Sequence, residues 1–239
     1  MFLQLRRAPR LDARIEDAWR ARPQREFDAT TDKPLMKITD DVPEGYWPIF
    51  KGESFDLWES DTGTFYAWGN PETLVVELQN RRIRGHRLEH SAFAEFTKSF
   101  VRNPGALPCW RPRIAFRRVF RASDSRTVRV ALIPGNVFLT DKAPYFLWPR
   151  GDQRDEAYLV GVLSSLILDW YAWRFVELQV ESTHSPSPVL CAIRSCGKGS
   201  WPLQDASQRR TIALPNGLKQ SAFNMESCIR MKRRTGSPN

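Results

Sequence analysis

The apolar run YLVGVLSSLILDWYAWRFV at residues 158–176 constrains the fold of this chain most, because the rest of the sequence is polar and basic. As an α-helix, its nineteen residues would extend about 30 Å, close to the thickness of a bilayer core. Asp169 and Arg174 oppose insertion, since a charged side chain near the centre of a membrane costs about 2.5–3.5 kcal/mol. We therefore expect a buried helix in a globular domain, and no membrane partner.

The sequence before this run carries the signals of a helix start. Asp152 is a suitable N-cap, and Asp155 and Glu156 would lie in the first turn, at the positive end of the helix dipole. We predict one long helix over about 153–177. A further helix is predicted at 70–84, where Asn and Pro stand at the cap and at the first helical position.

Two runs with a two-residue period lie between these helices: RIAFRRVF at 113–120 and TVRVALI at 127–133. Apolar side chains alternate in them with arginine, threonine and alanine, which is typical of half-buried strands. The polar segment RASDSR joins the runs and indicates a hairpin-like unit, and the runs NVFL and PYFLW add further strands. We predict an α+β fold, β-rich at about 110–150 and packed on the long buried helix, with flexible ends.

Composition divides the chain into three parts. Residues 1–44 mix arginines with acids and are expected to form a charged segment or linker, whereas 45–178 carries the predicted domain. Residues 179–239 are rich in Ser, Pro and Gly without a sustained period, so we expect disorder there. The first residues lack the apolar stretch of a signal peptide, and the four cysteines show no paired framework. We therefore expect a cytoplasmic protein.

The net charge of +9 indicates a polyanionic partner, either nucleic acid or an acidic membrane surface. The densest basic feature is the segment 111–129, which holds seven arginines and one acid, Asp124. Arginine forks bind phosphates and also read the edges of guanine bases. Contact with DNA or RNA is the main interpretation, and the alternative is an ordinary hairpin with a solvated charged face.

Common catalytic motifs are missing from the sequence: GxxxxGK[ST], HExxH and GxSxG do not occur. Three residue sets remain as weak metal-site interpretations. They are His86 with His90; Cys191 and Cys196 with His184 and Cys228; and the acidic cluster of Glu53, Asp56, Glu59 and Asp61. None forms a complete recognisable ligand pattern, so we predict no catalytic residue, cofactor or metal in this chain.

Three segments combine into a family pattern: WPIFKGESFDLWESDTGTFYAW at 47–68, LPCWRPRIAFRRVFRASDSRTVRVALIPGNVFLTDKAPYFLWP at 107–149, and DEAYLVGVLSSLILDWYAWRFVE at 155–177. Their order and spacing resemble the target-recognition half of large bacterial adenine-specific DNA methyltransferases. These are restriction–modification enzymes that carry methylation and recognition in one chain. The resemblance covers about half of this chain.

The resemblance implies double-stranded DNA as the partner and S-adenosylmethionine as the cofactor of a full-length enzyme, in which the target adenine is flipped out of the duplex. This chain has neither the family's N/D-P-P-Y/F motif nor its Gly-rich cofactor loop. It therefore resembles a target-recognition piece that lacks the catalytic part, and whether a separate chain supplies that part stays open. Arg118 stands where the family usually has an acid, and Trp173 where it has an arginine. The resemblance ends near residue 178, and we hypothesise that a frameshift there produced the tail.

We expect the DNA contacts to come from the basic segment and from the aromatic segment before it. The primary candidates are Arg111, Arg113, Arg117, Arg121, Arg126, Thr127 and Arg129. The secondary candidates are Lys51, Phe55 and Trp58, whereas Phe116 and Phe120 are expected in the core. Two alternatives stay open: an inactive pseudogene product, and a protein-interaction fragment with no DNA role.

Overall fold

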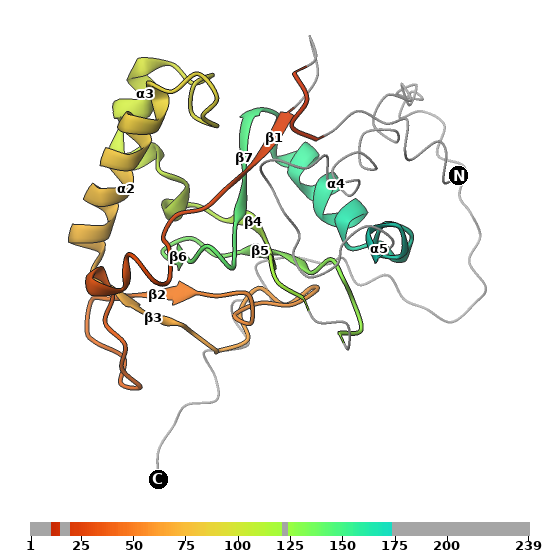
Figure 1. The fold of residues 1–239 in the computed structure, drawn as a ribbon, viewed down its shortest axis with the longest axis horizontal. Helices are drawn as coiled ribbons and strands as arrows, with labels where there is room; N and C mark the ends of the chain where they lie inside the picture. The colour runs from red at the N-terminus through yellow and green to blue at the C-terminus, as the bar shows by residue number, and fades with distance from the viewer. Residues whose placement is uncertain (1–10, 15–19, 121–123, 174–239) are drawn as a thin grey trace, which may run out of the picture. The chain divides into compact units, whose positions relative to one another are not determined.

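The computed structural model of the chain describes residues 11–14, 20–120 and 124–173. Short 3-10 turns lie at Lys33–Leu35, Pro104–Ala106 and Pro108–Trp110. The strands and helices are, in chain order, β1 (Arg20–Gln24), β2 (Trp47–Phe50), β3 (Ala67–Gly69), α2 (Pro71–His86), α3 (Lys98–Arg102), β4 (Arg113–Phe116), β5 (Val130–Ile133), β6 (Phe138–Leu139), β7 (Tyr145–Arg150), α4 (Gln153–Leu163) and α5 (Leu166–Trp173). Helices and strands are thus mixed along the chain, which confirms the α+β fold class (Figure 1).

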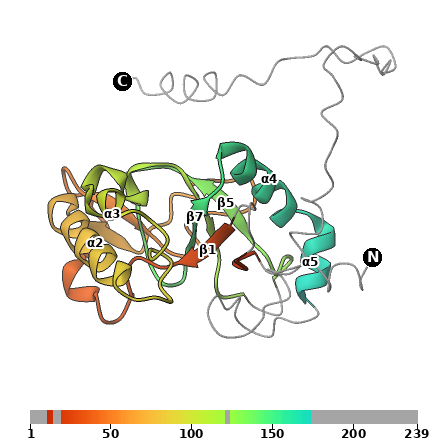
Figure 2. The same cartoon turned by 90° about the horizontal axis from the view of Figure 1, so that it is seen from above.

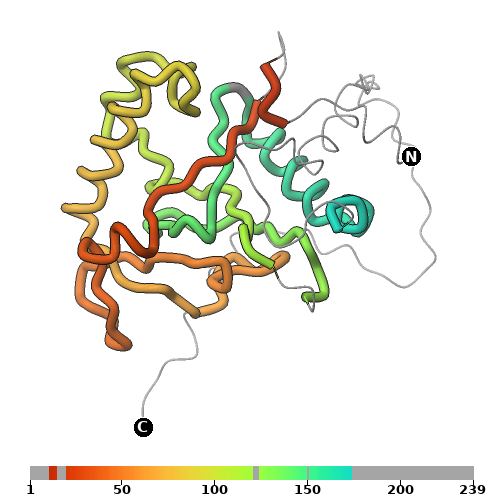
Figure 3. Tube along the Cα trace, viewed as in Figure 1, coloured from red at the N-terminus to blue at the C-terminus, as the bar shows by residue number. Residues whose placement is uncertain are grey.

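The larger sheet has the strand order β1-β7-β4-β5 with antiparallel neighbours. β4 and β5 pair from Arg113 opposite Ile133 to Phe116 opposite Val130, which confirms the hairpin-like unit, although each strand is shorter than predicted. The edge strand β1 lies in a part of the chain that we expected to be a linker, and it runs beside β7 (Figure 3). Its sequence, RARPQ, has no apolar period, because an edge strand is held by backbone pairing on one side only.

Both faces of the larger sheet are covered by the rest of the domain. On one face, Ile114 and Phe116 of β4 share a core cluster with Leu159 and Leu163 of α4. Ala115, which points the other way, belongs to a second cluster that includes residues of β5 and β7. Figure 2 shows α4 and α5 on one side of the sheet strands and α2 and α3 on the other. All four residues of β4 are buried, so the prediction of a half-buried strand with a solvent-facing arginine side is wrong for β4.

The smaller sheet, β3-β2-β6, combines an antiparallel β2–β3 pair with a parallel β2–β6 pair. Helix α2 packs Leu74 and Leu78 against this sheet, in a cluster with Ile49 and Phe138. Gly69 ends β3 close to the helix, and a Cβ atom at this position would lie 2.3 Å from Cδ1 of Leu74. Only glycine therefore allows this approach of strand and helix.

The start of α2 confirms the predicted cap. The side chain of Asn70 accepts a hydrogen bond from the backbone N–H of Glu72 at 2.9 Å, and Pro71 occupies the first turn. The helix continues to His86, two residues beyond the prediction. Among the described residues, none of the helices has the length and apolarity needed to cross a membrane.

The predicted long helix at 153–177 is two helices, α4 and α5, as far as the chain is described. Asp152 forms the expected cap, and with Asp155 it completes a capping box. The break falls at the serine pair. Ser164 ends α4, and the hydroxyl oxygen of Ser165 accepts a hydrogen bond from the backbone N–H of Leu168 in the first turn of α5. Serine favours such caps over helix interiors, which explains the break. Residues 174–177 lie outside the described residues.

Candidate nucleic-acid interface

The loop between β2 and β3 contains a tight turn with an exposed tryptophan at its tip. The backbones of Asp56 and Glu59 exchange two hydrogen bonds of 3.0 Å each, which leaves Leu57 and Trp58 at the tip. Trp58 has a φ of 63° and is 76 % exposed. A bulky residue in the left-handed region is an outlier that the surrounding structure must hold in place.

The basic segment between β4 and β5 holds this loop. Nε of Arg117 donates a hydrogen bond of 2.6 Å to the carbonyl of Gly52, and Nη1 of Arg129 lies 2.7 Å from Oδ2 of Asp56. In Figure 1 the loop after β2, in orange, runs beside the green segment that joins β4 and β5. A Cβ on residue 52 would lie 2.9 Å from Cγ of Arg117, so the glycine permits the close approach.

Three of the predicted contact residues bind the protein itself. Arg113 is 4 % exposed and forms an ion pair of 3.0 Å with the buried Glu26. Arg126 lies 3.3 Å from the carboxylate of Asp169 and donates a hydrogen bond of 2.7 Å to the carbonyl of Ser164. Thr127 is buried, and its backbone N–H donates to Asp169 at 2.8 Å. These side chains position the hairpin and leave little surface for an external ligand.

Other candidates differ in how far solvent reaches them. Arg111 is exposed, Arg117 is half-buried, and Lys51 is half-buried with an ion pair of 2.9 Å to Glu53. Phe55 is fully buried in the core, whereas Trp58 points outward. Arg121 lies outside the described residues. The expected core residues Phe116 and Phe120 are each 5 % exposed.

The local charges distinguish Arg117 from its neighbours. Asp56 pairs with Arg129, and Asp141 lies 3.5 Å from Arg118. Within the described part of the chain no carboxylate forms an ion pair with Arg117, whose hydrogen bond goes to a neutral carbonyl. Burial, followed by the nearby positive charge of Arg129, lowers the pKa of Arg117. Of the half-buried arginines in the described part of this segment, Arg117 is thus the one without a carboxylate ion pair.

Asp169 is the organising residue that sequence reasoning missed. One of its carboxylate oxygens accepts hydrogen bonds of 2.8 Å from the backbone N–H groups of both Thr127 and Val128. It also faces Arg126, so α5 fixes the end of the basic segment. In the sequence, Asp169 is only a charge inside an apolar run, and its partners lie more than forty residues earlier along the chain.

The metal-site interpretations find no assembled ligand set where the structure describes the chain. Nowhere in residues 11–14, 20–120 and 124–173 do three or more His, Cys, Asp or Glu residues gather as metal ligands would. Nδ1 of His86 lies 3.1 Å from the carbonyl oxygen of Phe93. His184, Cys191, Cys196 and Cys228 lie outside the described residues.

Comparison with known proteins adds no relative: no protein-family model matches the chain, and no curated protein matches it significantly.

Proposed function

We propose that this chain is a DNA-binding target-recognition fragment related to the adenine-specific DNA methyltransferases of restriction–modification systems. The observation that carries the proposal is that the three resembling segments are joined by specific contacts. Arg117 to Gly52 and Arg129 to Asp56 join the second segment to the first, and Thr127 to Asp169 joins the second to the third. The three segments share a family pattern and pack into one unit, which supports a common role for them.

In this proposal the outer residues meet the duplex and the inner ones hold them in place. Arg111, Arg117 and Lys51 contact phosphates, while Arg129, which pairs with Asp56 and lies 4.0 Å from Asp124, holds the loop in place. Arg121, by its place in the sequence, adds a further cation. Arg113, Arg126 and Thr127 are positioning residues and Phe55 is a core residue. Phosphate contacts then dominate the affinity, and base contacts supply the choice of sequence.

Trp58 supports the same interpretation. A non-glycine residue in the left-handed conformation costs roughly 1–2 kcal/mol, and strained residues cluster at functional sites. The indole is 76 % exposed at the tip of a braced loop. Base–aromatic stacking is worth about 1–3 kcal/mol per base, so the proposed role of Trp58 is to stack on a base or wedge between base steps.

Catalysis is assigned to another polypeptide. The chain's sequence has no N-P-P-Y/F motif and no Gly-rich cofactor loop, so S-adenosylmethionine would bind a separate methyltransferase chain that acts in the cytoplasm on the DNA held here. The described residues contribute no step of methyl transfer in this proposal.

The test is fluorescence anisotropy with a labelled duplex and the full chain. Replacing Arg111 or Arg117 by alanine is expected to weaken binding about three- to tenfold, because each change removes one phosphate contact. Arg154→Ala is the matched control, since Arg154 is an exposed arginine on α4 outside the interface. Equal effects of all three substitutions would mean that only the net charge matters, and the proposed interface would be wrong.

A second candidate is a protein-interaction fragment with no DNA role. It is favoured by α5, where Leu166 is 72 % and Ile167 is 52 % exposed. Replacing both by serine is expected to leave DNA binding unchanged under the main proposal. If the chain binds no duplex and the double substitution abolishes an association detected by sedimentation, the second candidate is favoured.

A further inference from the structure

A cavity of about 210 Å³ lies where α2 faces β1 and β7, away from the loop that carries Trp58. Its walls include Gln24, Arg25, Arg82, Ser91 and Tyr145. The volume is smaller than the 300–1,000 Å³ typical of pockets for drug-sized ligands. It suits a small ion or the end group of a larger molecule.

Arg82 makes the charge of this cavity unusual. The side chain is 1 % exposed, and its guanidinium donates hydrogen bonds only to neutral oxygens: the carbonyls of Asn103 and Ala106 and the amide oxygen of Gln79. Its Nε atom has no hydrogen-bond partner. No carboxylate pairs with Arg82 in the part of the chain that the structure describes, and burial lowers its pKa. A buried charge without a counter-ion is costly to the fold.

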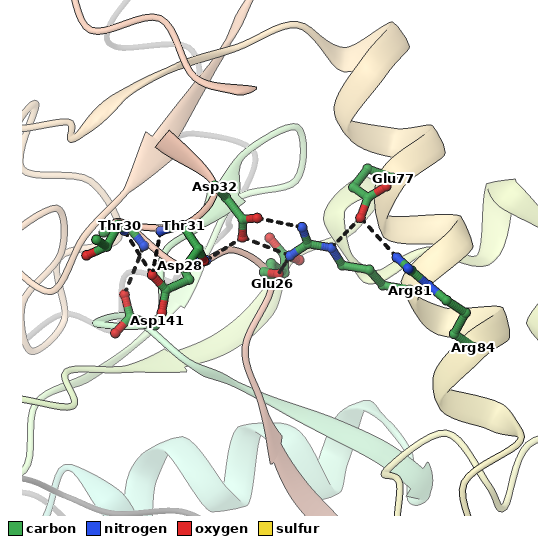
Figure 4. Close-up of polar contacts among 10 residues, drawn as sticks. Glu26, Asp28, Thr30, Thr31, Asp32, Glu77, Arg81, Arg84 and Asp141 are labelled. Carbon is green, nitrogen blue, oxygen red and sulfur yellow. Dashed lines mark hydrogen bonds and ion pairs between the residues drawn. The ribbon is translucent and has the colours of Figure 1, made fainter. Parts of the chain in front are cut away.

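The adjacent Arg81 shows what a compensated arginine looks like in the same helix. Figure 4 shows its guanidinium between the carboxylates of Asp32 and Glu77, each 2.7 Å away. The hydrogen bonds that Arg81 donates to the carboxylate of Asp32 are the main reason that the pKa of Arg81 is raised. Arg81 and Arg82 are neighbours in the sequence, but among the described residues only Arg81 has carboxylate partners.

The other buried groups near the cavity do not supply a negative charge for Arg82. Glu26 itself lines the cavity, but its carboxylate is engaged by Arg113 and by the backbone N–H of Leu139. Burial raises the pKa of the Cys109 thiol to about 12 and also raises that of the Tyr145 phenol, so both stay neutral near pH 7. The guanidinium groups of Arg82 and Arg113 and the carboxylate of Glu26 thus leave one buried positive charge in excess.

Tyr145 provides a donor that the fold does not use. The residue is 2 % exposed and lines the cavity, and its hydroxyl makes no hydrogen bond among the described residues. A hydroxyl on a cavity wall that no described residue engages is available to a ligand. The exposed Arg25 adds a second cation to the lining, and Ser91 a second hydroxyl.

We infer that this cavity binds a phosphate group, held by the hydroxyl of Tyr145 and by the uncompensated field of Arg82, with Arg25 closing over it. A free phosphate and the phosphate of a nucleic-acid backbone share this chemistry. The inference does not depend on DNA binding by the arginine hairpin, because the two sites use different residues.

The probe is inorganic phosphate, titrated calorimetrically into the full chain at constant ionic strength set with sodium chloride. Wild-type protein is expected to bind phosphate and to melt at a higher temperature in phosphate than in chloride. Tyr145→Phe is expected to weaken binding about tenfold, since it removes one hydrogen bond to a charged ligand. Tyr66→Phe is the matched control, because the Tyr66 hydroxyl bonds the carbonyl of Ala29, outside the cavity lining.

The possible results distinguish the phosphate site from the proposed DNA function. No heat of binding and no melting shift beyond that in chloride would overturn the inference, and so would phosphate binding that is the same in Tyr145→Phe and wild type. If Tyr145→Phe weakens the binding of phosphate but not of duplex DNA, the ligand is a free phosphate. If it weakens both, and phosphate competes with duplex, the ligand is a nucleic-acid phosphate. Loss of duplex binding with phosphate binding intact would contradict only the proposed DNA function.

Discussion

Nη1 of Arg129 and Oδ2 of Asp56 lie 2.7 Å apart, and this ion pair ties the segment between β4 and β5 to the loop that displays Trp58. The Arg129 side chain is 14 % exposed and that of Asp56 is 37 % exposed, so the pair is partly shielded from water. A basic segment and an aromatic tip that lie far apart in the sequence thereby become one surface.

A double-mutant cycle measures this pair. Arg129→Ala and Asp56→Ala are each expected to destabilise the fold, and the coupling free energy is expected to be about 1 kcal/mol, at the upper end for exposed pairs because of the shielding. Urea unfolding of the two single variants and the double variant checks the value. Purely additive effects would mean that the pair does not hold the loop.

Trp58→Gly is expected to stabilise the fold and to weaken DNA binding. Glycine adopts a φ of 63° without steric cost, although it loses more backbone entropy on folding, so the net gain is about 0.5–1 kcal/mol. Loss of the indole is expected to lower duplex affinity about tenfold.

Trp58→Ala is the companion variant, since it keeps the strained backbone and removes the ring. It is expected to lose the same affinity without the gain in stability. Duplexes that carry 2-aminopurine report unstacking directly, through fluorescence that rises with wild type and not with either variant. A stabilised Trp58→Gly protein that binds DNA normally would remove Trp58 from the interface.

Asp169→Ala is expected to destabilise the domain by about 3 kcal/mol. The change leaves the backbone N–H groups of Thr127 and Val128 without acceptors and Arg126 without its carboxylate. Asp169→Asn keeps an acceptor oxygen and is expected to lose less. Chemical denaturation ranks the two variants, and equal losses would show that the charge alone matters.

The buried Glu26 predicts a pH dependence of stability. Burial is the largest cause that raises its pKa above the ordinary value of 4.5, and the charge of Arg113 opposes the shift. The folded state therefore holds this proton more tightly than the unfolded state, and the contribution of Glu26 falls as pH rises from 4.5 through the folded pKa.

The difference in unfolding free energy between wild type and Glu26→Gln isolates this effect. It is expected to be largest near pH 4.5 and to shrink toward pH 8, because glutamine does not titrate. Other carboxylates titrate alike in both proteins and cancel in the difference. A difference that grows with pH would mean that the charge of Arg113 outweighs burial at Glu26.

Local signals in the sequence predicted local structure. The cap at Asn70, the capping residues at Asp152 and the two-residue period around Ile114 all appear in the structure, because each depends on neighbours within a few positions. The same reasoning failed at Arg113. Its partner Glu26 lies 87 positions away, so the sequence could not show that this arginine is buried.

The sequence predicted which residue types form the candidate interface, but not how these residues are arranged. Seven arginines in one segment identified the hairpin, but Asp169, Asp56 and Asp141, which bind several of them, come from other elements. The serine pair that breaks the predicted long helix gave a weak signal, since serine also occurs inside helices. Trp58 stood out only as an aromatic residue, because its left-handed backbone depends on the turn that Asp56 and Glu59 close.

The most direct test of DNA binding by this chain is its affinity for duplex DNA as a function of salt concentration. If phosphate contacts dominate binding, log affinity falls linearly with log salt concentration, by about 0.9 for each contact, which gives a slope near −3.6 for four contacts. Arg111→Ala is expected to reduce the steepness by about one contact. Binding that stays constant between about 50 and 200 mM salt, or no binding at the lower concentration, would contradict the proposed DNA interface.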